Sequence, residues 1–403
     1  MKKKLRRVYI GIMGGIGLFP IQPLFAENKP DPLIHQIGIE GRSGYIFPTN
    51  PFFRGENDLQ KPLKKTLSAQ LKYSFQFQNN TPIDKIYGGA YQGLGIGYFN
   101  FGNTTELGNP LAVYLFQGGR IRKFTPGLSL NYEWNFGVSS GWKPYNYETN
   151  FNNVAIGSKM NAYMNVNFYL KWILSRRVDF ISGVTLNHFS NGNTQFPNAG
   201  LNSIGLKIGL VYNINRLEQD YIPQLYRPLI PAFPRHFSYD LVLFGSWRRK
   251  GVIFMDKQIA SPHSYEVAGI NFSALYNFGY KLRAGLSLDG VYDASANVYT
   301  EDYIVGTEQQ FFKPPLSKQF ALGLSARGEY VMPFFTVGIG LGYNILQGGP
   351  DLKGFYQMLA LKIEITRSSF LHIGYNLQNF HTPNYLMLGI GFRFHNRYPF
   401  CYR

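Results

Sequence analysis

The sequence predicts an all-β protein, a transmembrane antiparallel β-barrel, and three features of its 403 residues support that prediction. Apolar and polar residues alternate along many segments, and the connections between these segments alternate between long and short. Tyr, Phe and Gly are abundant, with 29, 34 and 44 copies, as in barrels with aromatic girdles. After residue 26 no apolar run reaches the roughly 18 residues of a spanning helix, so this chain would cross a membrane with strands.

The first 26 residues have the order of a secretory signal peptide. Residues 1–7 carry five cations and no acid, residues 8–19 are apolar but too few to span a bilayer, and Ala26 can precede a cleavage point.

Without the five cations of the leader, the formal net charge falls from +17 to +12. This charge fits either a generally basic surface or a surface that attracts an anionic partner. Nucleic acid is not expected as that partner, because the protein is exported. Cys401 is the only cysteine, which excludes a disulfide within the chain.

The alternation that predicts strands has a period of two residues. In residues 67–77 every odd position is apolar and every even position is polar. Such a strand has one apolar and one polar face, and these runs are long enough for a tilted strand to cross hydrocarbon. In lipid every backbone amide needs a partner, so the sheet must close. The same alternation recurs in residues 128–136, 204–214, 335–345, 359–365 and 386–394.

The connections predict about sixteen strands with a periplasmic N-terminus, because outer-membrane barrels have long external loops and short periplasmic turns. The long polar connections fall near residues 44–65, 103–110, 138–157, 191–202, 250–262 and 293–316. The short connections fall near residues 79–85, 120–126, 175–177, 279, 332–333 and 367–368.

A proline-rich stretch, residues 216–235, separates two halves of similar strand content. The halves end alike, with residues 186–190 in the first resembling residues 377–381 in the second, which indicates an old duplication. We favour one barrel built from both halves, and two tandem eight-stranded barrels are the alternative. The expected organisation is a signal peptide (1–26), an N-terminal barrel half that carries the site (27–215), a periplasmic linker (216–235) and a degenerate C-terminal half (236–403).

His188 and Ser190 are the candidate catalytic pair. They lie two residues apart on a predicted strand and therefore on one face, where the imidazole can act as the base that activates the hydroxyl. The rest of that face, in residues 178–186, is mostly apolar, so the pair is expected to look toward lipid, where polar groups are costly and suggest function. The alternative is that this segment is a strand end with a polar loop and no catalytic role, and that the side chain of His188 only extends to the lipid headgroups.

The segment His188-Phe-Ser190-Asn191, followed by Pro197-Asn198-x-Gly200, resembles the signature of the outer-membrane lipid A 3-O-deacylases, the PagL-type acyloxyacyl hydrolases. The resemblance implies a barrel in the outer membrane of a Gram-negative bacterium, with a Ser-His-acid triad at the outer leaflet that removes the ester-linked chain at position 3 of lipid A. It implies lipid A, or lipopolysaccharide, as substrate and no cofactor or metal. By position, His188 is the general base, Ser190 the nucleophile, Asn191 a structural or polarising neighbour, and Asn198 part of an oxyanion hole.

Two departures from the family pattern stand out. The position of the family's acid falls on Asn202, whose amide can accept the ring N–H of histidine but lends no negative charge. The chain is also about twice the family's usual size. In the second half, Asn379 and His381 stand where His188 and Ser190 stand in the first, so that half is expected to be structural.

Two other functions compete with an esterase: a passive barrel, either a channel or a scaffold with a decayed site, and an interaction protein that uses its external loops. Asp, Glu and His elsewhere show no metal-ligand spacing. Several charged residues fall on polar strand faces and are expected to pair inside the lumen. They are Glu133, Arg327, Glu329, Lys362, Glu364 and Arg393.

Overall fold

The computed structural model describes residues 33–79, 81–216, 229–254, 257–261, 263–301, 310–380 and 382–399. The predicted signal peptide, residues 217–228 of the predicted linker, His381 and Cys401 lie outside the described residues. Within the described ranges, no helix is long and apolar enough to cross a membrane.

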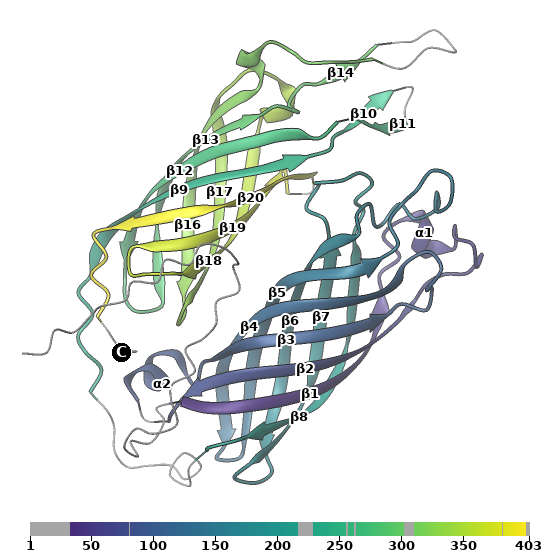
Figure 1. Cartoon of the computed structure of the whole chain (residues 1–403). Helices are drawn as coiled ribbons and strands as arrows, with labels where there is room; N and C mark the ends of the chain where they lie inside the picture. Colours follow the sequence, from purple (N-terminus) through teal and green to yellow (C-terminus); the bar gives the residue numbers. More distant parts are fainter. Residues whose placement is uncertain are drawn as a thin grey trace, which may run out of the picture. The chain divides into compact units, whose positions relative to one another are not determined.

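The first half of the chain forms a closed barrel of eight antiparallel strands (Figure 1). Each strand pairs with the next along the chain, and the last pairs with the first. The short helix α1 (Pro51–Arg54) lies in the first long loop, and α2 (Pro82–Tyr87) lies in the connection after the second strand. The strands are β1 (Leu33–Ile46), β2 (Lys65–Phe77), β3 (Tyr91–Asn100), β4 (Gly108–Thr125), β5 (Leu128–Trp142), β6 (Met160–Ile173), β7 (Val178–Ser190) and β8 (Leu201–Asn213).

The second half forms another closed barrel of eight antiparallel strands. Two small hairpins, β10 (Gly251–Phe254) with β11 (Lys257–Ala260) and β14 (Tyr299–Thr300) with β15 (Phe311–Phe312), lie in its long loops. The 3-10 turns η1 (Leu316–Lys318) and η2 (Pro350–Leu352) lie there too. The barrel strands are β9 (His236–Arg248), β12 (Tyr265–Asn277), β13 (Leu282–Asp293), β16 (Phe320–Val331), β17 (Phe335–Gln347), β18 (Phe355–Glu364), β19 (Ser369–Gln378) and β20 (Thr382–Phe394).

The all-β barrel class, the sixteen barrel strands and their division into two eight-stranded halves are confirmed, but the preference for one common barrel is wrong. β8 pairs with β1 from Asn213 opposite Gln36 to Ser203 opposite Ile46, which closes the first sheet before the second half begins. Likewise β20 pairs with β9. Alternating residues decide which face of a strand is apolar, but one wide barrel and two narrow ones satisfy the backbone amides equally well.

The interior of the first barrel is packed with side chains. An aromatic cluster fills the end that carries the long loops, and Phe189 stands at its centre. Its ring lies 5.0 Å from that of Phe99 and 5.1 Å from those of Trp142 and Tyr163. Rings at these distances and in edge or stacked arrangements add to the stabilisation from burial alone.

A network of buried charges lies inside the same barrel. Lys72 donates to Glu40 at 2.8 Å and to Glu133 at 2.6 Å, while Arg42 pairs with Glu40 at 2.8 Å. Lys207 pairs with Glu40 at 3.1 Å. The predicted inward position of Glu133 is therefore confirmed, and each charge of the network has an oppositely charged partner in the place of water.

The second barrel has a similar internal network. Asp240 accepts from Arg393 and from Lys362, both at 2.8 Å, and Lys362 also contacts Glu329. Two further residues that were expected to pair do so: Arg327 lies 2.6 Å from Asp289, and Glu364 lies 3.9 Å from Arg393. The polar strand faces therefore point inward in both halves, as the alternation predicts.

Replacing Glu133 with alanine should destabilise the protein by about 3–5 kcal/mol, because Lys72 would keep its charge in the lumen with one carboxylate fewer to balance it. Unfolding by urea of protein refolded in detergent micelles measures this free energy. The matched control is Glu148→Ala, in an exposed loop, which should cost less than about 1 kcal/mol. Equal stability of the two variants would contradict a structural role for the network.

Candidate active site

His188 and Ser190 lie on the outer wall of the first barrel, near the end of β7. Along this strand the odd-numbered residues Ile181, Thr185 and Phe189 are buried inside the barrel. The even-numbered positions face outward, as the exposed side chains of Val184 and Leu186 show. His188 and Ser190 belong to the outward set, so their predicted position on the apolar outer face is confirmed.

Three polar side chains form a continuous hydrogen-bonded chain on this wall. His188 Nε2 lies 2.8 Å from Ser190 Oγ, and His188 Nδ1 lies 2.7 Å from Asn202 Oδ1. The contact with Asn202 arises because β7 and β8 place His188 directly opposite Asn202 in the antiparallel ladder. The geometric expectation for Asn202 is therefore confirmed.

The amide of Asn202 determines the tautomer of the histidine. Its oxygen can only accept, so Nδ1 carries the proton and donates it to Asn202 Oδ1. Nε2 then presents its lone pair to the hydroxyl of Ser190, which donates to it. A hydroxyl that already donates to a neutral imidazole is arranged for proton transfer when the oxygen attacks an electrophile.

Phe189 anchors this pair from the inside. It lies between the two residues in sequence, points into the barrel and is fully buried in the aromatic cluster. The end of β7 is therefore held by packing, although His188 and Ser190 themselves face outward. The sequence pattern shows the alternation that turns Phe189 inward, but not the rings that it meets.

The loop of residues 191–200 is tied together by its asparagines. Asn198 Oδ1 accepts from the backbone N–H of Asn191 at 2.9 Å, and the side-chain amide of Asn191 donates to the carbonyl of Gln195 at 3.0 Å. The other end of the Asn198 amide donates to Asn193 Oδ1 over a longer distance, 3.3 Å. Asn191 and Asn198 therefore hold the loop next to Ser190. Of these three hydrogen bonds, the one donated by Nδ2 of Asn198 is the longest.

Gly200 is required by the way this loop returns to β8. Its φ angle is +71°, which favours glycine. A Cβ at this position would lie 3.0 Å from the carbonyl oxygen of Phe189 and 3.3 Å from Cε1 of His188. Any larger residue would therefore press on the imidazole. Gly200 stands in the sequence motif, but this contact with His188 is visible only in the structure.

The second barrel lacks the corresponding loop. β19 ends at Gln378, and a connection of three residues leads to β20, which begins at Thr382. Asn379 lies in this connection with a positive φ of 49°, so it does not continue the strand face as His188 does. His381 is outside the described residues.

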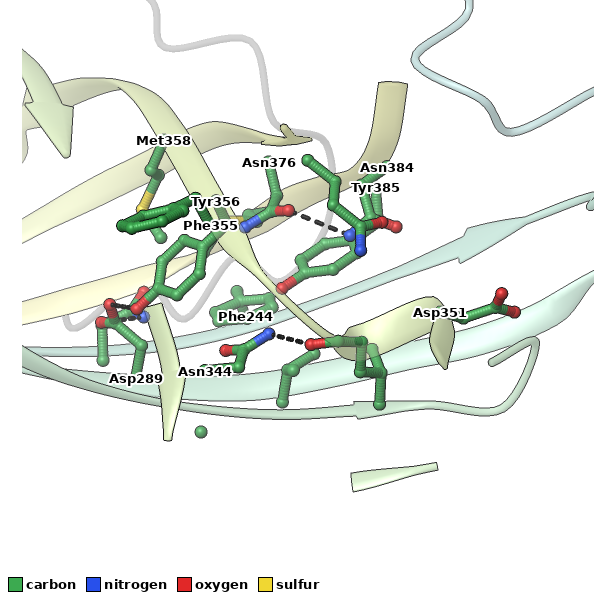
Figure 2. Close-up of a pocket in the computed structure, with 16 residues that line it drawn as sticks. Phe244, Asp289, Asn344, Asp351, Phe355, Tyr356, Met358, Asn376, Asn384 and Tyr385 are labelled. Atoms are coloured by element: carbon green, nitrogen blue, oxygen red, sulfur yellow. Dashed lines mark hydrogen bonds between the residues drawn. The ribbon is translucent and has the colours of Figure 1, made fainter. Parts of the chain in front are cut away.

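The described part of the second barrel contains a small hollow (Figure 2). Within it, Tyr356 donates to Asp289 at 2.6 Å, and Asn384 donates to Asn376 at 3.0 Å. The residues that line it include no serine, cysteine or histidine. This hollow therefore offers no pair of nucleophile and imidazole base.

Across the described residues of both barrels, no three His, Cys, Asp or Glu side chains are grouped to hold a metal ion.

Two family models match the chain, one on each barrel. Residues 64–211 match the model of the lipid A 3-O-deacylase (PagL), and residues 237–396 match that of the acyloxyacyl hydrolase C-terminal domain. The first match includes His188, Ser190 and Asn202. Among curated proteins, no sequence matches the chain.

Several solved structures of outer-membrane proteins are similar to parts of the chain. Neisserial surface protein A is 9% identical, with 45% of this chain and 97% of that one covered and a TM-score of 0.30. The outer membrane enzyme PagL is 14% identical, with 43% and 97% covered and a TM-score of 0.29. Omp33 of Acinetobacter baumannii is 11% identical, with 90% and 99% covered and a TM-score of 0.16.

Proposed function

The chain belongs to the outer-membrane lipid A 3-O-deacylase family, and on that premise we propose that its first barrel is a serine esterase that hydrolyses an ester-linked acyl chain of lipid A. The observation that carries the proposal is the hydrogen-bonded chain from Ser190 through His188 to Asn202 on the lipid-facing wall. A barrel without a catalytic function does not need three polar side chains on its lipid-facing surface, where polar groups are energetically costly.

The reaction proceeds in two steps. Ser190 Oγ attacks the ester carbonyl while its proton passes to His188 Nε2, and the tetrahedral intermediate collapses when the imidazolium protonates the sugar oxygen that leaves. Water, deprotonated by His188, then hydrolyses the acyl-enzyme. We assign the Nδ2 group of Asn198 to the oxyanion, because its contact with Asn193 is long enough to be exchanged. One such donor typically lowers the barrier by about 3 kcal/mol.

Asn202 replaces a carboxylate in this mechanism. It orients His188 and keeps the proton on Nδ1, which is the first task of the acid in such a triad. It lacks the negative charge that stabilises the imidazolium, so each turnover is expected to be slower than with an acid at this position.

The site lies at the barrel end that carries the long loops, which we place at the outer leaflet. Lipid A resides in that leaflet, so its acyl esters meet Ser190 without leaving the membrane. A basic protein, with a formal net charge of +17 including the leader, also suits a phosphorylated substrate.

The packed lumen of the first barrel counts against a channel, the main alternative. The aromatic cluster and the charge network of Glu40, Lys72 and Glu133 occupy its interior. A barrel of eight strands is just wide enough for its side chains to fill it. A scaffold that binds partners through its loops is compatible with this packing, but it does not require the pair His188 and Ser190.

Replacing Ser190 with alanine should abolish deacylation and leave folding intact, because the hydroxyl faces outward and supports no other described side chain than His188. Mass spectrometry of lipid A from cells that express each form measures the activity. Heat-modifiable mobility in gels reports the folded barrel. Deacylation by the folded variant at the level of the unaltered protein would refute the nucleophile assignment.

Replacing Asn202 with aspartate should raise the turnover rate about fivefold to tenfold, since a charged acceptor strengthens a hydrogen bond by about 1 kcal/mol. Glutamate should raise the rate or leave it unchanged, and leucine should lower it because the ring loses its orienting partner. Initial rates on purified lipid A in micelles decide this. A leucine variant as fast as the unaltered protein would mean that Asn202 does not orient His188.

The second barrel should be catalytically silent. The double replacement Asn379→Ala and His381→Ala should leave the deacylation rate unchanged within about twofold, since neither position offers a nucleophile beside a base. The measurement is the same micellar assay on folded protein. A large loss of activity without loss of folded protein would show that the second barrel takes part in the reaction.

A further inference from the structure

The two ends of the first barrel differ in charge. The end with the short connections, the turn end, has eight cations and two acids, whereas the loop end has six cations and four acids. The excess of positive charge is therefore concentrated at the turn end. These counts cover residues 78–90, 118–128, 171–179 and 213–216 at the turn end, and 47–65, 101–110, 141–160 and 191–201 at the loop end.

Both acids of the turn end are buried. Asp179 lies inside the barrel and pairs with Arg216 at 2.9 Å, and Asp84 lies in α2. Four cations, by contrast, are exposed, and none of them forms an ion pair within the part of the chain that the structure describes. They form what we call the basic rim, which consists of Arg122 and Lys123 at the end of β4 and of Arg176 and Arg177 in the turn between β6 and β7.

Strand pairing brings the two turns of the basic rim together. The backbone N–H of Ile173, at the end of β6, donates to the carbonyl of Gly127, in the turn after β4, at 2.8 Å. In the neighbouring row, Leu128 of β5 lies opposite Trp172 of β6. β4 and β6 are two strand spacings apart, about 10 Å, so the long side chains of both turns can reach one phosphate group or two adjacent ones.

The basic rim lies at the border of the apolar outer wall. Beside its cations, Ile121, Phe124 and Leu174 are 51%, 49% and 61% exposed. Trp172 and Phe180 lie opposite each other on β6 and β7, with their rings 5.4 Å apart. In outer-membrane barrels, aromatic residues at a strand end mark the layer where hydrocarbon meets the headgroups. The four cations therefore lie at the depth of the lipid headgroups.

Two arginines of the rim contact aromatic side chains. The guanidinium of Arg122 lies 5.7 Å from the centre of the Phe124 ring, and Nη1 of Arg177 donates to the hydroxyl of Tyr212 at 3.2 Å. Arginine can lay its aliphatic stem along an apolar surface while the guanidinium stays at the polar border. Neither contact neutralises the charge, so both guanidinium groups keep N–H donors for an anion.

We propose that the basic rim binds the phosphate groups of anionic phospholipids, whose acyl chains lie against Ile121, Phe124 and Leu174. Arginine and lysine form their strongest hydrogen bonds with phosphate and carboxylate oxygens, and clusters of such residues attract anionic lipids. A zwitterionic lipid carries a cation next to its phosphate and is therefore attracted less. With the loop end at the outer leaflet, the rim meets the phospholipids of the inner leaflet. This lipid site is separate from Ser190 and needs no hydrolysis there.

The test measures the affinity of the folded full protein, in micelles of an uncharged detergent, for phosphatidylglycerol and for phosphatidylcholine with the same acyl chains. Native mass spectrometry counts the bound lipid. Each Lys or Arg near an anionic lipid contributes about fivefold in affinity, so a headgroup that meets two of the four cations should bind about twentyfold or more tightly as phosphatidylglycerol. Replacing Arg122, Lys123, Arg176 and Arg177 with glutamine should bring the two affinities within about threefold of each other.

The matched control removes four exposed cations from the loop end by replacing Lys61, Lys64, Lys65 and Lys143 with glutamine. It changes the net charge equally and should keep the preference for phosphatidylglycerol within about twofold of that of the unaltered protein. Mobility in gels with and without heating confirms that each variant folds.

Three results would overturn the inference. The first is equal affinity of the unaltered protein for the two lipids. The second is an equal loss of preference in the loop-end control, because binding would then depend on net charge and not on the rim. The third is displacement of the lipid by soluble glycerol phosphate at equal concentration, which would mean that the rim takes a free phosphate and not a lipid. None of these measurements involves ester hydrolysis, so the esterase assignment stands or falls separately.

Discussion

In hydrocarbon, each backbone N–H and C=O of a strand must find its partner on another strand, and the rest of this structure depends on that constraint. It requires each sheet to close, which β8 does with β1 and β20 does with β9. Closure at eight strands leaves a lumen that side chains can fill, so aromatic rings and paired charges occupy the interior. It also turns the apolar faces outward, where a soluble protein would place polar ones.

The same constraint makes the outer wall an unusual place for the active site that we propose. A strand cannot bend away from its neighbours to present a side chain, so such a site has to be built from neighbouring residues on one face of a strand and from residues that face them on the next strand. Here the β7–β8 ladder supplies the contact between His188 and Asn202, and two residues of β7 supply the contact between His188 and Ser190. Phe189 holds the strand from within, and Gly200 lets the loop return past the imidazole. The site is therefore held in place by the strand pairing and the packing of the barrel that carries it.

The two barrels share their architecture but differ in the loop that borders the proposed active site, between β7 and β8 in the first barrel and between β19 and β20 in the second. In the first, ten residues connect β7 to β8 and place two asparagines beside Ser190. In the second, three residues connect β19 to β20, and the strand ends before the position of a base. A barrel can lack such a loop and keep its fold, because barrel closure depends on strand pairing and not on the connections at the rim.

The sequence by itself determined the barrel class, the strands, the inward charges and the outward positions of His188 and Ser190, because a period of two residues decides the face of each side chain. It also placed Asn202 beside His188, through the motif whose spacing reflects the hairpin. It did not decide whether sixteen strands close once or twice, because both arrangements pair every amide and differ only in contacts between residues far apart in the chain. The rings around Phe189, the approach of Gly200 to His188 and the junction of the two turns that carry the basic rim likewise follow from register between strands. That register exists only once the sheet has closed.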